Sequence, residues 1–129
     1  MSRKRGVYVL GYKRTPFGKF FGLLSCMTAP QLASEAIKDL TIRPGLGLGR
    51  SDAEIDGVIL GNVYSAGLGG APARQASLNA GLSLHCPAEL ARKECSSSLS
   101  ALKTATREIQ VGDAGLMIAG GMESMSQTP

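Results

Sequence analysis

Four short apolar runs alternate with helix-like segments along this chain, and that alternation restricts the fold more than any other feature of the sequence. The runs with the length of strands are residues 7–10, 57–61, 88–94 and 115–119. Strands separated by helices pair in parallel through right-handed crossovers. We therefore expect an α/β fold, with a mostly parallel sheet and helices on both faces, in the order βαβαβαβ. With 129 residues, 43% of them apolar, the chain is long enough for one core and short for two.

The first helix has a clear start signal. Thr28 can cap it, and Pro30 suits its first turn. Its apolar face would consist of Leu32, Ala33, Ala36, Ile37 and Leu40. Beyond this helix, residues 43–50 are expected to form a surface connection, and residues 51–54 a capping box that opens a short helical turn.

Two further helices are expected. One begins at Pro72 and runs to about Ala80, where Gly81 stops it. The other follows Cys95 and ends near Gly112. Its inward-facing positions would be Leu99, Leu102, Ala105 and Ile109.

Cys95 lies where the third strand-like run gives way to a helix. Backbone N–H groups at a helix start, with the helix dipole behind them, stabilise an anion and favour thiolate over thiol. A thiolate can attack a carbonyl carbon, so Cys95 is the candidate nucleophile. The alternative is a small buried residue at a helix start, a common role of free cysteine. The serines at 96–98 would line a site or only satisfy free N–H groups.

Loops that follow parallel strands gather at one edge of a sheet. Cys95 is therefore expected beside loops 62–70 and 120–126. The only histidine, His85, precedes its strand and would lie at the opposite edge. In the last loop, Glu123 is a general base, a residue that fixes loop amides, or the partner of an arginine such as Arg74.

The cysteines and the charge restrict the setting of the protein. Cys26, Cys86 and Cys95 cannot all pair within one chain, so free thiols in a reducing compartment are expected. No apolar run has the length of a signal sequence core or a membrane span, which predicts a cytoplasmic protein. A net charge of +4, without aromatic residues along a basic stripe, argues against nucleic acid as a partner. One histidine and no Cys-x-x-Cys spacing predict no metal site.

Several motifs of the chain point together to one enzyme family. They are Arg14-Thr15-Pro16-Phe17-Gly18, Gly61-Asn62-Val63, Ala66-Gly67-Leu68-Gly69, Pro72-Ala73-Arg74-Gln75-Ala76, Cys95-Ser96-Ser97-Ser98, and Gly120-Gly121-Met122-Glu123-Ser124-Met125-Ser126. The set closely resembles the N-terminal half of thiolases, the acetyl-CoA acetyltransferases and 3-ketoacyl-CoA thiolases. The resemblance implies that residues 1–129 form a truncated thiolase N-terminal domain, without the family's loop domain and C-terminal half.

The resemblance also implies a reaction. Cys95 would take the acyl group of an acyl-CoA as a thioester, in the condensation to, or the thiolysis of, a 3-ketoacyl-CoA. Acyl-CoA and CoA would be substrates, and no cofactor would be tightly bound. The family's histidine, asparagine and second cysteine match no residue here, so the chain alone is expected to be a half-site. Its partner would be a second copy or the missing C-terminal half, and a mitochondrial or peroxisomal location is an alternative to the cytoplasm.

One position departs from the family pattern. Ser98 stands where thiolases usually have glycine, and its side chain would crowd a close helix contact or the site. Two other functions stay open: a non-catalytic, truncated thiolase-like interaction module, and a condensing enzyme of the ketoacyl-synthase type. The Gly-Gly-Met-Glu-Ser-Met-Ser string favours thiolase over the second of these.

Overall fold

The computed structural model describes residues 5–42 and 55–129. Its elements are α1 (Ala29–Ile42), β1 (Gly57–Gly61), α2 (Pro72–Asn79), β2 (Ala88–Ala91), α3 (Ser97–Val111), β3 (Met117–Gly121) and a 3-10 turn, η2 (Met125–Gln127). The connection expected at 43–50 and the capping box expected at 51–54 lie outside the described residues.

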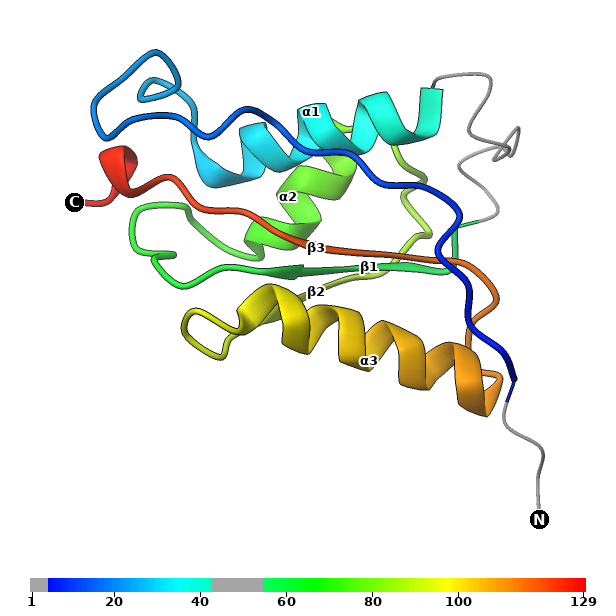
Figure 1. Ribbon diagram of the computed structural model, residues 1–129. Helices are drawn as coiled ribbons and strands as arrows, with labels where there is room; N and C mark the ends of the chain where they lie inside the picture. Colours follow the sequence, from blue (N-terminus) through cyan, green and yellow to red (C-terminus); the bar gives the residue numbers. More distant parts are fainter. Residues whose placement is uncertain (1–4, 43–54) are drawn as a thin grey trace.

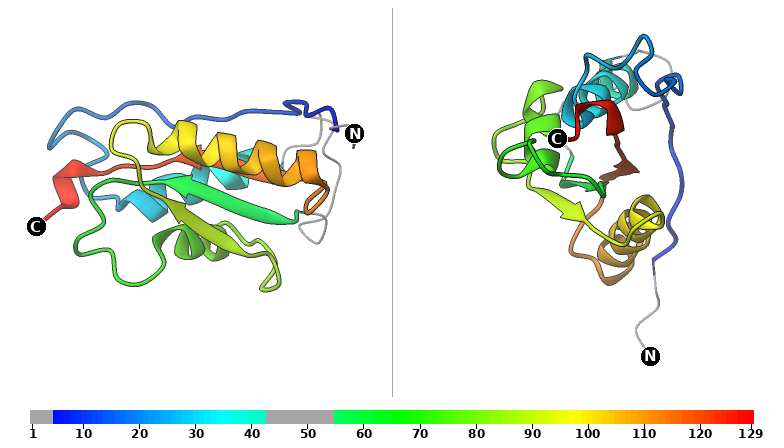
Figure 2. Two further views of the ribbon diagram at one scale, coloured as in Figure 1. Left: turned by 90° about the horizontal axis from the view of Figure 1, so that it is seen from below. Right: turned by 90° about the vertical axis from the view of Figure 1, so that its left-hand side faces the viewer.

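The three strands form one parallel sheet in the order β2-β1-β3. Leu60 of the central strand pairs with Leu90 on one side and with Gly120 on the other. Helices α1 and α2 cover one face of the sheet, and α3 covers the other (Figures 1 and 2). The predicted fold class, a parallel α/β sheet with helices on both faces, is confirmed.

The prediction of a strand at residues 7–10 is wrong. This segment has no regular secondary structure, and Tyr8 and Val9 are both 81% exposed. It runs along the side of the molecule (Figures 1 and 2). A run of β-formers sets an extended backbone, but a strand also needs a partner for its N–H and C=O groups. Within the described residues, β1 is the strand that has a partner on both sides.

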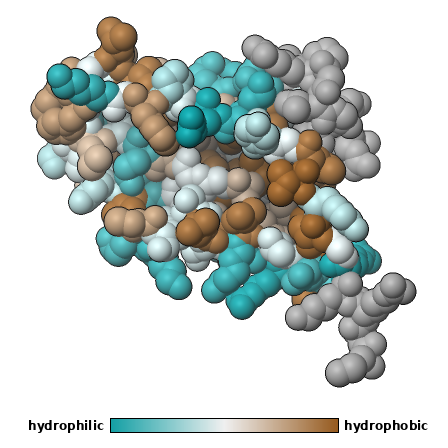
Figure 3. All heavy atoms as spheres, in the orientation of Figure 1, coloured by the Kyte–Doolittle hydropathy of each residue, from teal (hydrophilic) through white to brown (hydrophobic). Residues whose placement is uncertain are grey.

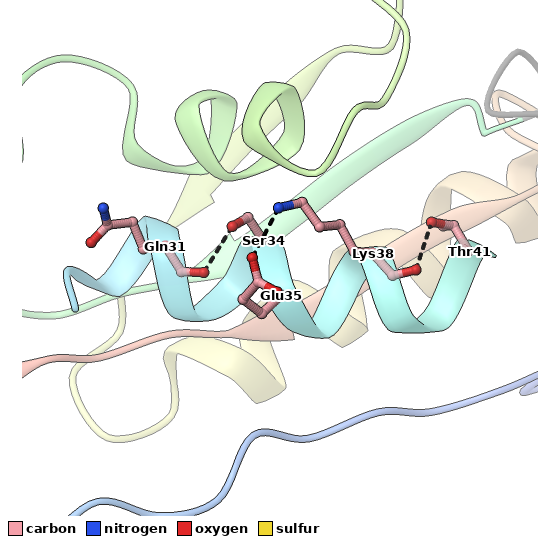
Figure 4. A network of polar contacts seen from close by, with 5 residues as sticks. All are labelled: Gln31, Ser34, Glu35, Lys38 and Thr41. Carbon is pink, nitrogen blue, oxygen red and sulfur yellow. Dashed lines mark hydrogen bonds and ion pairs between the residues drawn. The ribbon is translucent and has the colours of Figure 1, made fainter. Parts of the chain in front are cut away.

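Helix α1 begins as predicted, and part of its predicted apolar face is buried. The Thr28 amide donates to the Gln31 side chain over 2.8 Å, and the Gln31 amide donates back to Thr28 Oγ1 over 3.4 Å, which is a capping box. Ser34 Oγ donates to the Gln31 carbonyl and Lys38 forms an ion pair with Glu35, as Figure 4 shows. In the core that this helix shares with α2 and the sheet lie Ala29 and, from the predicted face, Ala33 and Ile37. The other three predicted positions are half-buried: Leu32, Ala36 and Leu40.

Helix α3 occupies the predicted place and buries Ala105 as predicted, but its two leucines do not face inward. Leu99 and Leu102, both expected inside, are 67% and 50% exposed. The buried positions are Ser97, Ala101 and Ala105, spaced four residues apart. Their small side chains let the helix approach the sheet closely, where Ala101 and Ala105 pack with Ile59.

Three boundaries, on two strands, differ from the expected ones. The third run was expected to extend to residue 94, but β2 ends at Ala91 and the backbone of Glu94 turns to φ 46°. The fourth run was expected at 115–119, but β3 begins at Met117 and includes Gly120 and Gly121. The length of the run did not predict the end of β2 or either bound of β3. Hydrophobicity indicates burial, whereas pairing with β1 determines where β2 and β3 begin and end.

Candidate active site

The carboxyl ends of the strands open into a cavity of about 730 Å³. Four parts of the chain line it: residues 12–20 with parts of α1, the end of β1 with residues 62–63, residues 94, 95, 97 and 98 at the start of α3, and the end of β3 with residues 122–126. The predicted meeting of Cys95 with the loops after β1 and β3 is therefore confirmed.

Cys95 is exposed and lies two residues before the first residue of α3. Just before it, Glu94 has a left-handed backbone, which residues other than glycine adopt rarely and where their surroundings impose it. Ser97 supplies that constraint: its Oγ accepts from the Lys93 amide over 2.8 Å and donates to the Glu94 carbonyl over 2.7 Å. The cysteine is thus presented on a tight, internally bonded turn.

The serines after Cys95 have different roles. The amides of Ser96 and Ser97 donate to the carbonyls of Lys93 and Glu94, each over 3.0 Å. These two N–H groups are thus engaged inside the turn and do not serve an anion at the sulfur. Ser97 is buried and satisfies backbone groups, one of the two roles expected for the serines, whereas Ser98 is exposed and lines the cavity.

Two glycines let α3 press against the sheet beside Cys95. A Cβ added at Gly61 would lie 2.5 Å from the backbone nitrogen of Ser98, and one added at Gly121 would lie 2.8 Å from the Ser98 Cβ. Real side chains do not approach this closely, so both positions require glycine. The side chain of Ser98, the departure from the family pattern, therefore fits at the helix contact because residue 121 has none.

Glu123 fixes loop amides, one of the three roles expected for it, whereas Arg74 donates to the carbonyls of Leu84 and Cys86 instead. Its Oε1 accepts from Asn62 Nδ2 over 2.8 Å and from the Tyr64 amide over 3.2 Å, and its Oε2 accepts from the Val63 amide over 2.9 Å. The carboxylate therefore joins the segment after β3 to the segment after β1.

The loop after β1 is also tied to the segment that leads to Cys95. The Asn62 amide donates to the Ala91 carbonyl over 3.3 Å, and the Arg92 guanidinium donates to the Val63 carbonyl over 2.9 Å. Asn62 is 1% exposed, and its Nδ2 also donates to the Met122 carbonyl over 3.1 Å. The ends of all three strands are thus connected through residues 62 and 63.

Residues 12–20 form a wall of the cavity that was not expected from the sequence. Lys13 pairs with Asp39 of α1 over 2.8 Å, and the Arg14 guanidinium lies 4.8 Å from the centre of the Phe17 ring. The following loop is attached to the end of the chain, where the Phe21 amide donates to Ser126 Oγ over 2.9 Å. The signal for this wall was present in the motif Arg14–Gly18, but no periodicity connects that motif with the strand ends.

His85 lies away from this site, as expected. It is exposed in the loop before β2, at the amino end of a strand whose carboxyl end leads to Cys95. Among residues 5–42 and 55–129, no group of three or more metal-ligating side chains is found. In the same residues, no helix is long and apolar enough to cross a membrane.

The three thiols are free and differ in their surroundings. Cys26 is exposed and lies outside the main cavity, in a second hollow beside α1. Cys86 is 3% exposed in the loop before β2, and burial raises the pKa of its thiol above the usual value, partly offset by the nearby Arg74 charge. Cys95 is thus the one of the three that opens into the main cavity.

Comparison with known proteins identifies close relatives. Residues 7–129 match the family model "Thiolase, N-terminal domain". Over the whole chain, 45% of residues are identical to a cytosolic acetyl-CoA acetyltransferase of Gibberella zeae, of which the chain covers 32%. A mitochondrial acetyl-CoA acetyltransferase of Danio rerio is 42% identical over 95% of the chain, which covers 28% of that protein.

A solved structure agrees with these sequence matches. The crystal structure of the Bacillus anthracis acetyl-CoA acetyltransferase superposes with a TM-score of 0.90 at 30% identity, over 100% of this chain and 32% of that one. The chain therefore spans about a third of the length of the relatives it matches.

Proposed function

We propose that this chain, which belongs to the thiolase family, supplies the acyl-accepting nucleophile of a thiolase-type acyltransferase, and that Cys95 is this nucleophile. The observation that carries the proposal is the place of the Cys95 thiol: it opens into the cavity where the carboxyl ends of the strands meet. Parallel α/β folds place their ligands at this edge of the sheet. The relatives named acetyl-CoA acetyltransferases support an acyl-CoA as the acyl donor.

The proposed reaction transfers an acyl group from the sulfur of CoA to the sulfur of Cys95. The Cys95 thiolate attacks the carbonyl carbon of the acyl-CoA, and the tetrahedral intermediate collapses with release of the CoA thiolate. The product is a thioester on Cys95, which stays a good acyl donor. A carbanion of a second acyl-CoA would then take the acyl group in condensation, and CoA would take it in the reverse, thiolytic direction. Neither direction requires a tightly bound cofactor.

Acetyl transfer to the thiol tests this role directly. The chain is incubated with acetyl-CoA or with the small thioester S-acetyl-N-acetylcysteamine, and each cysteine-containing peptide is weighed by mass spectrometry. We expect acetylation at Cys95, none in Cys95→Ser, and little at Cys26, an exposed thiol outside the main cavity. Equal acetylation of Cys26 and Cys95 would contradict the proposal, since it would show only the reactivity of any exposed thiol.

We also propose that the chain alone is a half-site. Among the described residues, the lining of the cavity contains one thiol, Cys95, and no imidazole. Proton transfer to and from the substrate requires groups of suitable pKa within hydrogen-bond reach. Thiolysis of acetoacetyl-CoA by this polypeptide is therefore expected to be undetectable, and robust turnover that is lost in Cys95→Ser would refute this part of the proposal.

The surface favours a partner, either a second copy or a C-terminal half of the family type. Leu99, Leu102 and Val111 on α3 are between 50% and 71% exposed. Figure 3 shows apolar groups on the face that carries the N-terminal segment and α3. Exposed apolar surface of this kind marks an interaction site. Light scattering is expected to show self-association, and a stable monomer would argue for a self-sufficient domain. The free thiols support a reducing compartment, and we propose the cytoplasm, with the mitochondrion or the peroxisome as the alternatives.

A further inference from the structure

The carboxylate of Glu123 is the most heavily bonded acidic group at the cavity. Three N–H groups converge on it, from the Asn62 side chain and from the amides of Val63 and Tyr64, over 2.8 to 3.2 Å. Both of its oxygens accept hydrogen bonds, so the carboxylate holds a loop and is not placed as a general base. Charge-assisted bonds of this kind are roughly twice as strong as neutral ones.

The peptide units that Glu123 holds are connected to the Cys95 turn by three contacts. The Val63 carbonyl accepts a hydrogen bond from the guanidinium of Arg92, which lies three residues before Cys95. The Asn62 amide donates to the last carbonyl of β2, at Ala91. Gly61, next to Asn62, packs directly on the backbone of Ser97 and Ser98.

We infer that Glu123 is a positioning residue for Cys95, which acts through the loop of residues 62–64 to hold the thiol turn against the ends of β1 and β3. This inference rests on the proposed acyl-accepting role of Cys95. Misplacement of a reacting atom by about 1 Å can cost on the order of a hundredfold in rate, so a clamp on the walls of the site affects the reaction itself.

The chain offers a matched control. Asp56 accepts the amides of Gly115 and Leu116 over 2.6 and 2.9 Å, and it joins β1 to β3 at the opposite end of the same two strands. Glu123→Gln and Asp56→Asn each replace a carboxylate by an amide of nearly the same shape. Each substitution places an NH2 group opposite N–H donors, which weakens the clamp. Glu123 lines the cavity, and Asp56 does not.

The test is the rate at which S-acetyl-N-acetylcysteamine acetylates Cys95, measured over a range of concentrations. In Glu123→Gln we expect the limiting rate to fall roughly tenfold or more, with the half-saturating concentration within about twofold of wild type. In Asp56→Asn both quantities should stay within about twofold. Iodoacetamide labelling of Cys26, which lies outside the main cavity in the second hollow, should be the same in all three proteins.

Each result decides something. A wild-type limiting rate in Glu123→Gln, or an equal fall in Asp56→Asn, overturns the positioning role and leaves the proposed function standing. Absence of acetylation in the wild-type protein overturns the proposed function, and the positioning role with it. If Glu123→Gln does not fold, a second variant, Arg92→Met, is used. It changes an exposed side chain and removes only the hydrogen bond from the Arg92 guanidinium to the Val63 carbonyl. The limiting rate should then fall several-fold, and an unchanged rate would overturn the inference.

Discussion

The two ends of strands β1 and β3 are closed by the same kind of clamp, yet they differ in what the clamp holds. At the amino end, Asp56 accepts two amides of the segment that enters β3, and its own amide donates to the Leu116 carbonyl over 2.9 Å. At the carboxyl end, Glu123 accepts two amides and a buried side-chain amide. Asp56 is exposed and sets the register of two strands. Glu123 is half-buried and sets the walls of a cavity.

The glycines of β1 repeat this contrast. Gly57 begins the strand and Gly61 ends it, and both are buried with ordinary backbone angles. A Cβ at Gly57 would meet the flexible end of Met117 at 3.0 Å, whereas a Cβ at Gly61 would meet rigid backbone at 2.5 Å. At the carboxyl end the backbone of α3 cannot shift locally to accept a side chain at residue 61, and such rigidity suits a site that needs a fixed geometry.

Alanine substitutions at these two glycines should show the largest effect. We expect Gly61→Ala to lower the free energy of unfolding by about 3 kcal/mol, because α3 must move away from the sheet. We expect Gly57→Ala to change it by less than about 1 kcal/mol, because the Met117 side chain can rotate. Urea denaturation followed by circular dichroism measures both. Similar losses in the two variants would mean that the two ends do not differ in rigidity.

A second pair of substitutions tests the contact of α3 with β3. An added Cβ at Gly121 would lie 2.8 Å from the Ser98 Cβ, whereas one at Gly120 would lie 3.7 Å from its nearest neighbour, Leu60. Gly121→Ala should therefore lower the free energy of unfolding by about 1 to 2 kcal/mol, and Gly120→Ala should be nearly neutral.

The same contact can be relieved from the other side. Ser98→Gly removes the atom that the new methyl group would meet, so the double variant Gly121→Ala, Ser98→Gly should recover about 1 kcal/mol relative to the sum of the single changes. Denaturation of all four proteins completes the cycle. Additive losses would show that the crowding at Gly121 has another source than Ser98.

The parts of the fold that the sequence predicts well are those with local signals. Thr28 and Gln31 form the cap of α1, Pro72 begins α2, and the buried run of β1 is continuous, so each of these can be read within one segment. The place of Cys95 at the start of a helix, beside the loops after β1 and β3, also follows from the order of the elements.

The errors arise where contacts between distant segments decide. Residues 7–10 have the composition of a strand but no partner among the described residues, and the backbone therefore stays unpaired. On α3, Leu99 and Leu102 were expected inside with Ala105, but the close approach of the helix to the sheet at Gly61 buries small side chains, Ala105 as predicted and Ala101 in place of the leucines. The wall formed by residues 12–20 lies far in sequence from Cys95, and helix or strand periodicity cannot predict such a neighbour.

The smallest expected effect is the pH dependence of the Asp56 clamp at the amino end. Hydrogen bonds from the amides of Gly115 and Leu116 lower the pKa of Asp56 below its usual 3.8, against a weak opposing effect of burial. Because the pKa is lower in the folded than in the unfolded state, the carboxylate stabilises the fold above pH 3.8, and this contribution is lost as the pH falls through the folded value.

Asp56→Asn should therefore be less stable than wild type near pH 7, and the difference should shrink as the pH falls below 3.8. Denaturation of both proteins across this range measures the difference, in which the contributions of other carboxylates cancel. A difference that stays constant down to acid pH would mean that the charge of Asp56 contributes nothing and that its shape alone holds the amino end. In that case the hydrogen-bonding geometry of residue 56, and not its charge, would account for the closure of the amino end.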